Sequence, residues 1–316
     1  MELGFPLDVI LFFTSALAGF FIYTIYFRPK ESLKAYKVVS KRFKDSSLYK
    51  SLGFTAEFHA IEDKFATFDE VSRAVKNAGL ESSNLIIGID FTASNEWQGR
   101  KSFSGRSLHH VFNSTKKLNP YQRVVQIISK TLEPFDTDNL IPAFGFGDLS
   151  TKDHSVFSFN VDGSPCKGLE DVLTQYSEVV RRVTLSGPTS FAPLINKAIE
   201  IVKQDQSFNI LVIVADGQVV EEHDQSTREA IVEASNFPLA ILVVGVGDGP
   251  WDRMKEYDEL LPQRRFDNFQ FVEFEEVIRN AKYPDTAFAL HALMEIPDQY
   301  KAIIELGLMQ SKSKED

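Results

Sequence analysis

Cysteine is nearly absent from this sequence of 316 residues, which contains Cys166 alone. A single cysteine excludes a disulfide framework, a zinc centre built from several thiolates, and a redox pair of the Cys-x-x-Cys type. Histidine is also scarce, with six residues and no His-Glu-x-x-His motif. The adjacent His109 and His110 would point about 100° apart on a helix and could not face one metal ion. We interpret both as ordinary loop or surface residues.

Positive charge is in deficit, with 34 Lys and Arg against 44 Asp and Glu and a net charge of -10. This balance argues against a nucleic acid as the main partner, because binding to a phosphate backbone requires an excess of basic residues. The stretch GVGDGP at residues 245–250 resembles a dinucleotide-binding loop, but Pro250 replaces its last glycine, so no nucleotide is expected. No acid–base pair or activated nucleophile is visible, and we do not expect an independent enzyme.

One long apolar run lies near the amino terminus, at residues 9–27, and carries no charge. It is long enough for a helix to cross the ~30 Å hydrocarbon core of a membrane. Residues 28–50 contain eight Lys or Arg and two acids, so the positive-inside rule places the following chain in the cytoplasm. The sequence therefore predicts a single-pass transmembrane anchor at residues 1–27 and a basic juxtamembrane linker at residues 28–60. A cleaved signal peptide and a buried core helix remain alternatives.

The rest of the chain alternates between apolar runs of strand length and amphipathic runs of helix length. This alternation predicts an α/β fold with a doubly wound, mainly parallel, Rossmann-like sheet. We assign it to residues 61–303, followed by a polar tail at residues 304–316. The predicted strands are residues 85–91, 140–146, 156–159, 210–215, 239–246 and 269–274. The predicted helices are residues 68–78, 121–132, 169–180, 192–202, 227–234, 251–260 and 286–294.

Oxygen-bearing side chains follow two of the predicted strands and precede the predicted helix at residues 192–202. GIDFTASN at residues 88–95 supplies Asp90, Thr92 and Ser94, ADG supplies Asp216, and SGPTSF supplies Thr189. Ligands of doubly wound sheets bind beyond the carboxyl ends of the strands, so these side chains can meet at one place. Oxygen-only donors suit Mg²⁺ or Mn²⁺. By itself, the cluster around Asp90 is more typical of a turn or a helix cap than of a metal site.

Three of these motifs in order resemble the metal-ion-dependent adhesion site of von Willebrand factor A domains: Asp-x-Thr-x-Ser, Gly-Pro-Thr and Ala-Asp-Gly. More narrowly, residues 65–302 resemble the copine-type A domain, especially the form in plant RING ubiquitin ligases. The blocks that carry this resemblance are GIDFTASN, SGPTSFAPLI, ADGQV, GVGDGPWDRM, FDNFQFV and FALHALMEIPDQY. The resemblance implies a metal site formed by Asp90, Thr92, Ser94, Thr189 and Asp216. Such a site would hold Mg²⁺ or Mn²⁺ and bind an acidic residue of a partner protein.

The chain also differs from the families that it resembles. Copines carry two calcium-binding C2 domains before the A domain, and about fifty residues cannot hold them. The plant ligases end in a RING, which needs roughly eight Cys and His ligands, whereas residues 303–316 contain neither. Glu2 stands where a myristoylation glycine would be. We therefore expect a protein-interaction module and, as the alternative, a substrate adaptor in ubiquitination without its own RING.

Overall fold

The computed structural model of the chain describes residues 45–52, 65–114, 116–261, 264–279 and 281–309. Contacts divide the chain into a unit of residues 1–45 and a unit of residues 46–316, and every element below belongs to the second unit. Residues 47–51, within the range predicted as a linker, form the short helix α3 (Ser47–Ser51). Within the second unit, α3 packs against α5 (Phe68–Asn77).

A six-stranded sheet forms the centre of this unit, with the strand order β4-β3-β1-β6-β7-β8. Neighbouring strands are parallel except at one edge, where β4 runs antiparallel to β3, so the predicted doubly wound, mainly parallel sheet is confirmed. All seven residues of β6 and of β7 are buried, as expected when helices cover both faces. The strands are β1 (Asn84–Asp90), β3 (Ala143–Phe146), β4 (Phe157–Ser158), β6 (Asn209–Ala215), β7 (Leu239–Gly245) and β8 (Phe269–Glu273).

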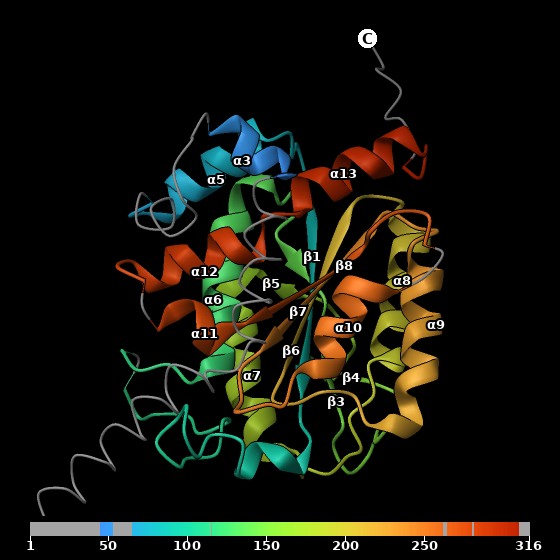
Figure 1. Cartoon of the computed structure of the whole chain (residues 1–316). Coiled ribbons are helices and arrows are strands. Elements are labelled where there is room, and N and C mark those ends of the chain that lie inside the picture. Colours follow the sequence, from blue (N-terminus) through green and yellow to red (C-terminus); the bar gives the residue numbers. More distant parts are fainter. Residues whose placement is uncertain (1–44, 53–64, 115, 262–263, 280, 310–316) are drawn as a thin grey trace, which may run out of the picture. The chain divides into compact units, whose positions relative to one another are not determined.

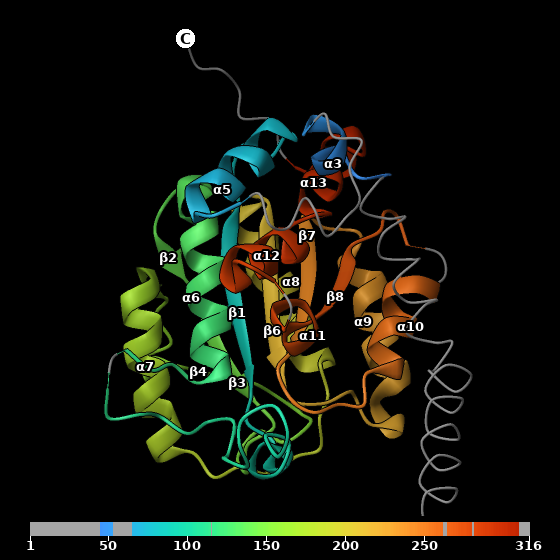
Figure 2. The same cartoon turned by 60° about the vertical axis from the view of Figure 1, so that its left-hand side comes forward.

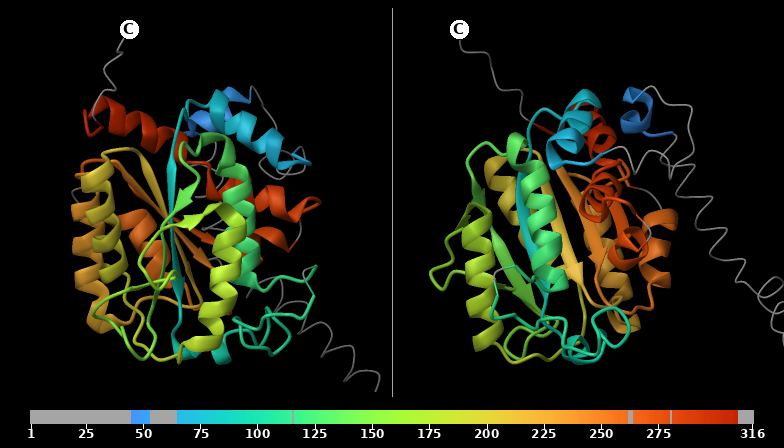
Figure 3. Two further views of the ribbon diagram at one scale, coloured as in Figure 1. Left: turned by 180° about the vertical axis from the view of Figure 1, so that it is seen from behind. Right: turned by 90° about the vertical axis from the view of Figure 1, so that its left-hand side faces the viewer.

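Two helical layers enclose the sheet (Figures 1 and 2). One layer contains α6 (Pro120–Leu132), α7 (Gly168–Arg182), α11 (Phe274–Ile278) and α12 (Pro284–Ala292). The other contains α8 (Ala192–Asp205), α9 (Asp224–Ala234) and α10 (Asp252–Leu260), as the views in Figure 3 also show. Alternate strand residues such as Leu211 and Ile213 pack into the core under α8 and α9. Gly88 permits this close approach, since a Cβ there would lie 2.1 Å from Cδ2 of Leu194.

Proline accounts for two of the differences between the predicted and the observed elements. The predicted strand 140–146 is divided at Pro142 into β2 (Leu140–Ile141), which pairs with β5 (Cys166–Lys167), and β3. Proline has no N–H to donate to a sheet ladder. The last predicted helix, residues 286–294, is present as α12, but the sequence did not predict the helix that follows it. This helix, α13 (Ile296–Glu305), has Pro297 in its first turn, where proline is favourable.

The predicted single-pass membrane location needs correction. Among the residues with a described structure, none of the helices combines the length and apolar character that a membrane crossing requires. The apolar run at residues 9–27, on which the prediction depended, lies outside the described residues. An uncharged run of sufficient length meets the size requirement of a membrane span, but size and composition do not by themselves establish a helix. The cytoplasmic location predicted for the A domain depended on the same run and is withdrawn together with the membrane anchor.

Candidate functional site

Two acids lie side by side at the carboxyl edge of the sheet. Asp90 is the last residue of β1 and Asp216 follows the last residue of β6, and these strands are neighbours paired through Ile89 and Val214. Both acids have an exposed fraction of 0%. The Oδ2 atom of each is buried and finds no hydrogen-bond partner among the described residues. A buried carboxylate oxygen without a partner is costly, so this pair calls for a compensating positive charge.

Thr92 and Ser94 lie between the two acids and contact them through a backbone N–H and through hydroxyl groups. The Thr92 N–H donates to Oδ1 of Asp90 at 2.8 Å, and the Thr92 hydroxyl lies 3.5 Å from Oδ1 of Asp216. The Thr92 and Ser94 hydroxyl oxygens are 2.9 Å apart. The structure thus brings Asp90, Thr92, Ser94 and Asp216, which span 127 positions of sequence from 90 to 216, into one contiguous group.

Thr189 comes from the segment that lies against both parts of this group. Its backbone oxygen accepts the Val220 N–H at 3.4 Å, just beyond Asp216, and the residue is 7% exposed. Upstream in the same segment, Ser186 forms a parallel bridge with Thr92, and its oxygen accepts the Ala93 N–H at 2.7 Å. The chain therefore positions Thr189 beside the loops that carry the two acids.

Electrostatics separate these two acids from the other acids at this edge. Burial raises the pKa of Asp90, and burial together with the nearby Asp90 charge raises the pKa of Asp216. Asp148 and Asp248, which follow β3 and β7, behave oppositely. Although partial burial opposes it, hydrogen bonds from Thr151 and Ser150 lower the pKa of Asp148. The pKa of Asp248 is also lowered, because the backbone N–H groups of Lys101 and Ser102 outweigh its burial.

At two positions of this edge, neighbouring segments of the chain lie so close together that only glycine fits. A Cβ on Gly247 would lie 2.3 Å from the backbone oxygen of Asp216. A Cβ on Gly147 would lie 2.5 Å from Cγ2 of Thr92, and Gly147 also has a φ of +80°, which favours glycine. The loops that follow β3 and β7 can therefore close against the acids only with glycine at these positions.

His109 supports the site from within, contrary to its interpretation as a loop or surface residue. Its ring is buried between Phe91 and Tyr121, with ring centroids 4.6 Å and 4.4 Å away and nearly parallel planes. Its Nε2 lies 2.9 Å from the backbone oxygen of Asp90, which can only accept, so Nε2 carries the proton. Nδ1 then accepts from the Tyr176 hydroxyl at 2.8 Å. Burial lowers the pKa of His109 to about 3, which keeps the ring neutral.

Asn95 completes this inner support. Its side-chain amide donates to the backbone oxygens of Asp90 and Thr92, at 3.3 Å and 3.0 Å, and its oxygen accepts from the Tyr121 hydroxyl at 2.7 Å. His109 and Asn95 thus fix the backbone that presents Asp90 and Thr92. No periodicity or motif of the sequence marks His109, because its partners come from residues 12 positions or more away in the chain.

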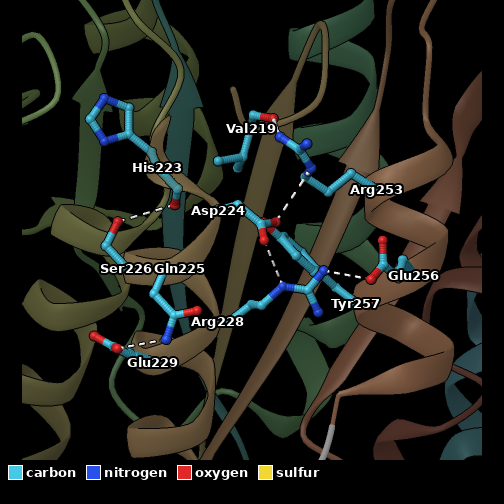
Figure 4. A network of polar contacts seen from close by, with 10 residues as sticks. All are labelled: Val219, His223, Asp224, Gln225, Ser226, Arg228, Glu229, Arg253, Glu256 and Tyr257. Atoms are coloured by element: carbon cyan, nitrogen blue, oxygen red, sulfur yellow. Dashed lines mark hydrogen bonds and ion pairs between the residues drawn. The ribbon is translucent and has the colours of Figure 1, made fainter. Parts of the chain in front are cut away.

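A second network holds the loop that follows Asp216 (Figure 4). Asp224 accepts from the Tyr257 hydroxyl at 2.7 Å and from Nε of Arg228 at 2.8 Å, and it pairs with Arg253 at 3.3 Å. Arg253 also donates to the backbone oxygen of Val219 at 2.8 Å, while its N–H donates to the side chain of Gln218. This network joins the 217–220 loop to α9 and α10 and restrains the position of Asp216.

The donor set at the edge consists of oxygen atoms. In the part of the chain that the structure describes, no three His, Cys, Asp or Glu side chains gather as a metal cage. The group contains two carboxylates and neutral hydroxyls, which are donors suited to a hard cation that also keeps other ligands. Its two orphaned carboxylate oxygens fit such a cation.

A doubly wound, mainly parallel sheet with this polar edge defines a von Willebrand factor A-like α/β domain. The chain belongs to the copine family, since the family model described as Copine matches residues 107–312. It is 52% identical over 270 residues to E3 ubiquitin-protein ligase RGLG1 of Arabidopsis thaliana, covering 81% of this chain and 55% of that protein. It is also 52% identical over 250 residues to Copine family protein 2 of Caenorhabditis elegans, covering 78% of this chain and 3% of that protein.

Among solved structures, the chain is similar to a von Willebrand factor type A protein from Catenulispora acidiphila. The identity is 14% and the TM-score is 0.42, and the match covers 70% of this chain and 43% of that one. The chain spans about half the length of its plant relative RGLG1, 55% of it. The resemblance to copine-type A domains and to the plant ligases, expected from six sequence blocks, is confirmed.

Proposed function

We propose that Asp90, Thr92, Ser94, Thr189 and Asp216 hold Mg²⁺ or Mn²⁺, and that the bound ion recruits an acidic residue of a partner protein. The observation that carries this proposal is the pair of buried carboxylates, each with one oxygen that lacks a hydrogen-bond partner among the described residues. A divalent cation would neutralise both charges and satisfy both oxygens.

The expected partner chemistry follows from the donor set. Two carboxylates balance a divalent ion, while hydroxyl ligands add no charge, so the ion retains an affinity for an anionic oxygen from outside. When bound, the ion would supply a positive charge and an open coordination position. This chain's residues would bind and orient it, with His109 and Asn95 fixing the backbone of Asp90 and the network of Asp224 restraining Asp216.

A thermal unfolding experiment tests the metal site. Bound ligand stabilises a fold by RT ln(1 + [L]/Kd), about 2.7 kcal/mol at a hundredfold excess over Kd. Mg²⁺ or Mn²⁺ should raise the melting temperature of the wild type and leave that of Asp216→Ala unchanged. Asp248→Asn is the matched control, because Asp248 lies at the same edge and its carboxylate accepts backbone N–H groups. Equal shifts in wild type and Asp216→Ala would place the ion elsewhere.

The relatives favour a second candidate function. RGLG1 is described as an E3 ubiquitin-protein ligase, and the shared region covers 81% of this chain. We propose as the alternative that the domain presents substrates for ubiquitination as an adaptor. Affinity capture from cell extract in Mg²⁺ and in EDTA, followed by mass spectrometry, separates the two. Ubiquitin-ligase components released by EDTA would favour the adaptor, whereas metal-dependent capture without such components would favour a general interaction module.

A further inference from the structure

The segment that follows the metal-binding motif contains no acid. From Trp97 to Leu132 the chain has neither Asp nor Glu, although the whole chain has a net charge of -10. Five basic residues fall in the first part of this segment, and all five side chains are exposed: Arg100, Lys101, Arg106, Lys116 and Lys117. We call residues 97–114 and 116–118 the basic loop. Because the chain as a whole is acidic, this run of one sign is a local feature of the surface.

The basic loop is folded on itself. The oxygen of Gly99 accepts the N–H groups of Phe103 and Gly105 at 3.0 Å and 2.9 Å. A side chain at position 99 is excluded, because a Cβ there would lie 2.3 Å from the backbone oxygen of Arg106. These contacts hold Arg100, Lys101 and Arg106 together on one compact turn.

Phe112 gathers further cations onto the same surface. The guanidinium of Arg106 lies 5.8 Å from the centroid of the Phe112 ring, and the ammonium of Lys117 lies 6.0 Å from it. Phe103 and His110 pack edge-on against this ring at 5.9 Å and 4.8 Å. Attraction between each cation and the ring face holds two like charges near each other. The arrangement leaves their charge available to an anion.

The basic loop is attached directly to the proposed metal site. The Leu108 N–H donates to the oxygen of Asn95 at 3.0 Å, and His109 contacts the oxygen of Asp90. At its other end, Gln98 donates to the oxygen of Gly249 at 2.8 Å and accepts the Asp248 N–H at 2.9 Å. The exposed cations therefore belong to the same edge of the sheet as Asp90.

Two acids adjoin the loop, and neither neutralises it fully. Glu96 is exposed at its start. Asp248 lies below it, but its carboxylate accepts the backbone N–H groups of Lys101 and Ser102 at 2.8 Å and 2.9 Å. With five exposed cations against these two acids, the surface beside the metal site keeps an excess of positive charge.

We propose that the basic loop and the metal site form one docking surface for an acidic segment of a partner protein. One carboxylate of the segment would complete the ion's coordination, and its other carboxylates would lie along Arg100, Lys101 and Arg106. The inference rests on the proposed function for the first carboxylate and extends it from a single acidic residue to a run of acids. Clustered exposed charges attract such a segment and make its binding sensitive to salt.

The test measures binding of a fluorescent octaglutamate peptide to the full chain in Mg²⁺ by fluorescence anisotropy. The loop variant carries Arg100→Gln, Lys101→Gln and Arg106→Gln. The control variant carries Arg73→Gln, Lys76→Gln and Lys130→Gln, which removes three exposed basic residues from α5 and from the last turn of α6. Exposed charge pairs contribute modestly one by one, so the three together should weaken binding by about tenfold. The control variant should bind like the wild type.

The expected result is that the loop variant loses affinity and salt sensitivity while its melting temperature still rises with Mg²⁺. Equal affinity of the loop variant and the wild type would overturn the inference. Binding of the wild type to phosphatidylcholine vesicles only when they contain phosphatidylserine, without binding of the peptide, would also overturn it in favour of a lipid surface. Failure of the metal proposal gives a different result from failure of this inference. If only the metal proposal is wrong, Mg²⁺ changes neither melting temperature nor peptide affinity, while the loop variant still binds more weakly than the wild type.

Discussion

Two pairs of acids at one edge of the sheet share their place after a strand but differ in whether all their carboxylate oxygens have hydrogen-bond partners. Asp90 and Asp216, the inner pair, end or follow the central strands β1 and β6, and each has a buried oxygen without a partner among the described residues. Asp148 and Asp248, the outer pair, follow β3 and β7 within three residues, and their oxygens accept N–H and hydroxyl groups from their own surroundings. Position after a strand therefore does not define a ligand site.

The difference shows what each pair contributes. The outer acids are complete as they stand and stabilise loops, as the lowered pKa values of Asp148 and Asp248 indicate. The backbone that presents Asp90 is held by His109 and Asn95, while burial raises the pKa of both inner acids and the Asp90 charge raises the pKa of Asp216 further. This lack of compensation is the feature on which the proposed cation site rests.

The largest expected effect comes from removing the support behind the inner pair. His109→Leu leaves the Tyr176 hydroxyl without its acceptor and removes one of the donors to the Asp90 backbone oxygen, and each loss in a buried site costs about 1–3 kcal/mol. We expect a loss of about 3 kcal/mol in unfolding free energy, measured by urea denaturation. His110→Leu is the control, because that neighbouring side chain is exposed and should change stability little. Similar losses in both variants would contradict the supporting role of His109.

Neutralising one acid of each pair, with EDTA present to remove metal ions, tests the difference between the two pairs. Asp148→Asn weakens charge-assisted hydrogen bonds to Ser150 and Thr151 and should lower the unfolding free energy by about 1–2 kcal/mol. Asp216→Asn removes repulsion with the buried Asp90 and should not lower it. Chemical denaturation of both variants at neutral pH gives the answer. Loss of stability in Asp216→Asn equal to that in Asp148→Asn would remove the distinction between the pairs.

The pH dependence of the unfolding free energy tests the role of Asp148 in the outer pair. The pKa of Asp148 is lowered in the folded state, so its contribution to stability is present above its unfolded value and is lost as pH falls through the folded value. The stability difference between wild type and Asp148→Asn should be constant above about pH 5 and shrink below about pH 4. Unfolding free energies measured across this range test the sign. A difference that grows on acidification would show that Asp148 is not stabilised as a carboxylate.

The smallest effect is expected for the neutral member of the proposed site. Thr189→Ala removes one uncharged oxygen, whereas Asp216→Ala removes a charge that balances the ion. We expect Thr189→Ala to weaken Mg²⁺ binding by less than about tenfold, which corresponds to less than about 1.4 kcal/mol. Isothermal titration calorimetry with Mg²⁺ and Mn²⁺ measures this change. Complete loss of binding in Thr189→Ala would mean that the Thr189 hydroxyl contributes more to Mg²⁺ affinity than one neutral ligand should.

The sequence by itself determined the fold class and the acids of the candidate site. Continuous apolar runs such as that of β6 require burial on both faces, and alternation with amphipathic runs leads to a doubly wound sheet. Because such a sheet brings the ends of neighbouring strands together, Asp90 and Asp216 could be placed side by side from their positions alone. The capping box of Thr67 and Glu70 at the start of α5 is likewise local chemistry.

Tertiary structure decided which acids are left without partners and what holds them. Asp90 and Asp148 both follow strands, and only the folded loops supply Asp148 with hydroxyl and N–H donors while leaving Oδ2 of Asp90 without a partner in the described part of the chain. His109 looked like a surface residue, because nothing near it in the chain reveals that Phe91, Tyr121 and Tyr176 enclose it. Hydrophobic pattern and turn chemistry act over a few residues, whereas hydrogen-bond satisfaction depends on groups that only the complete fold brings into contact.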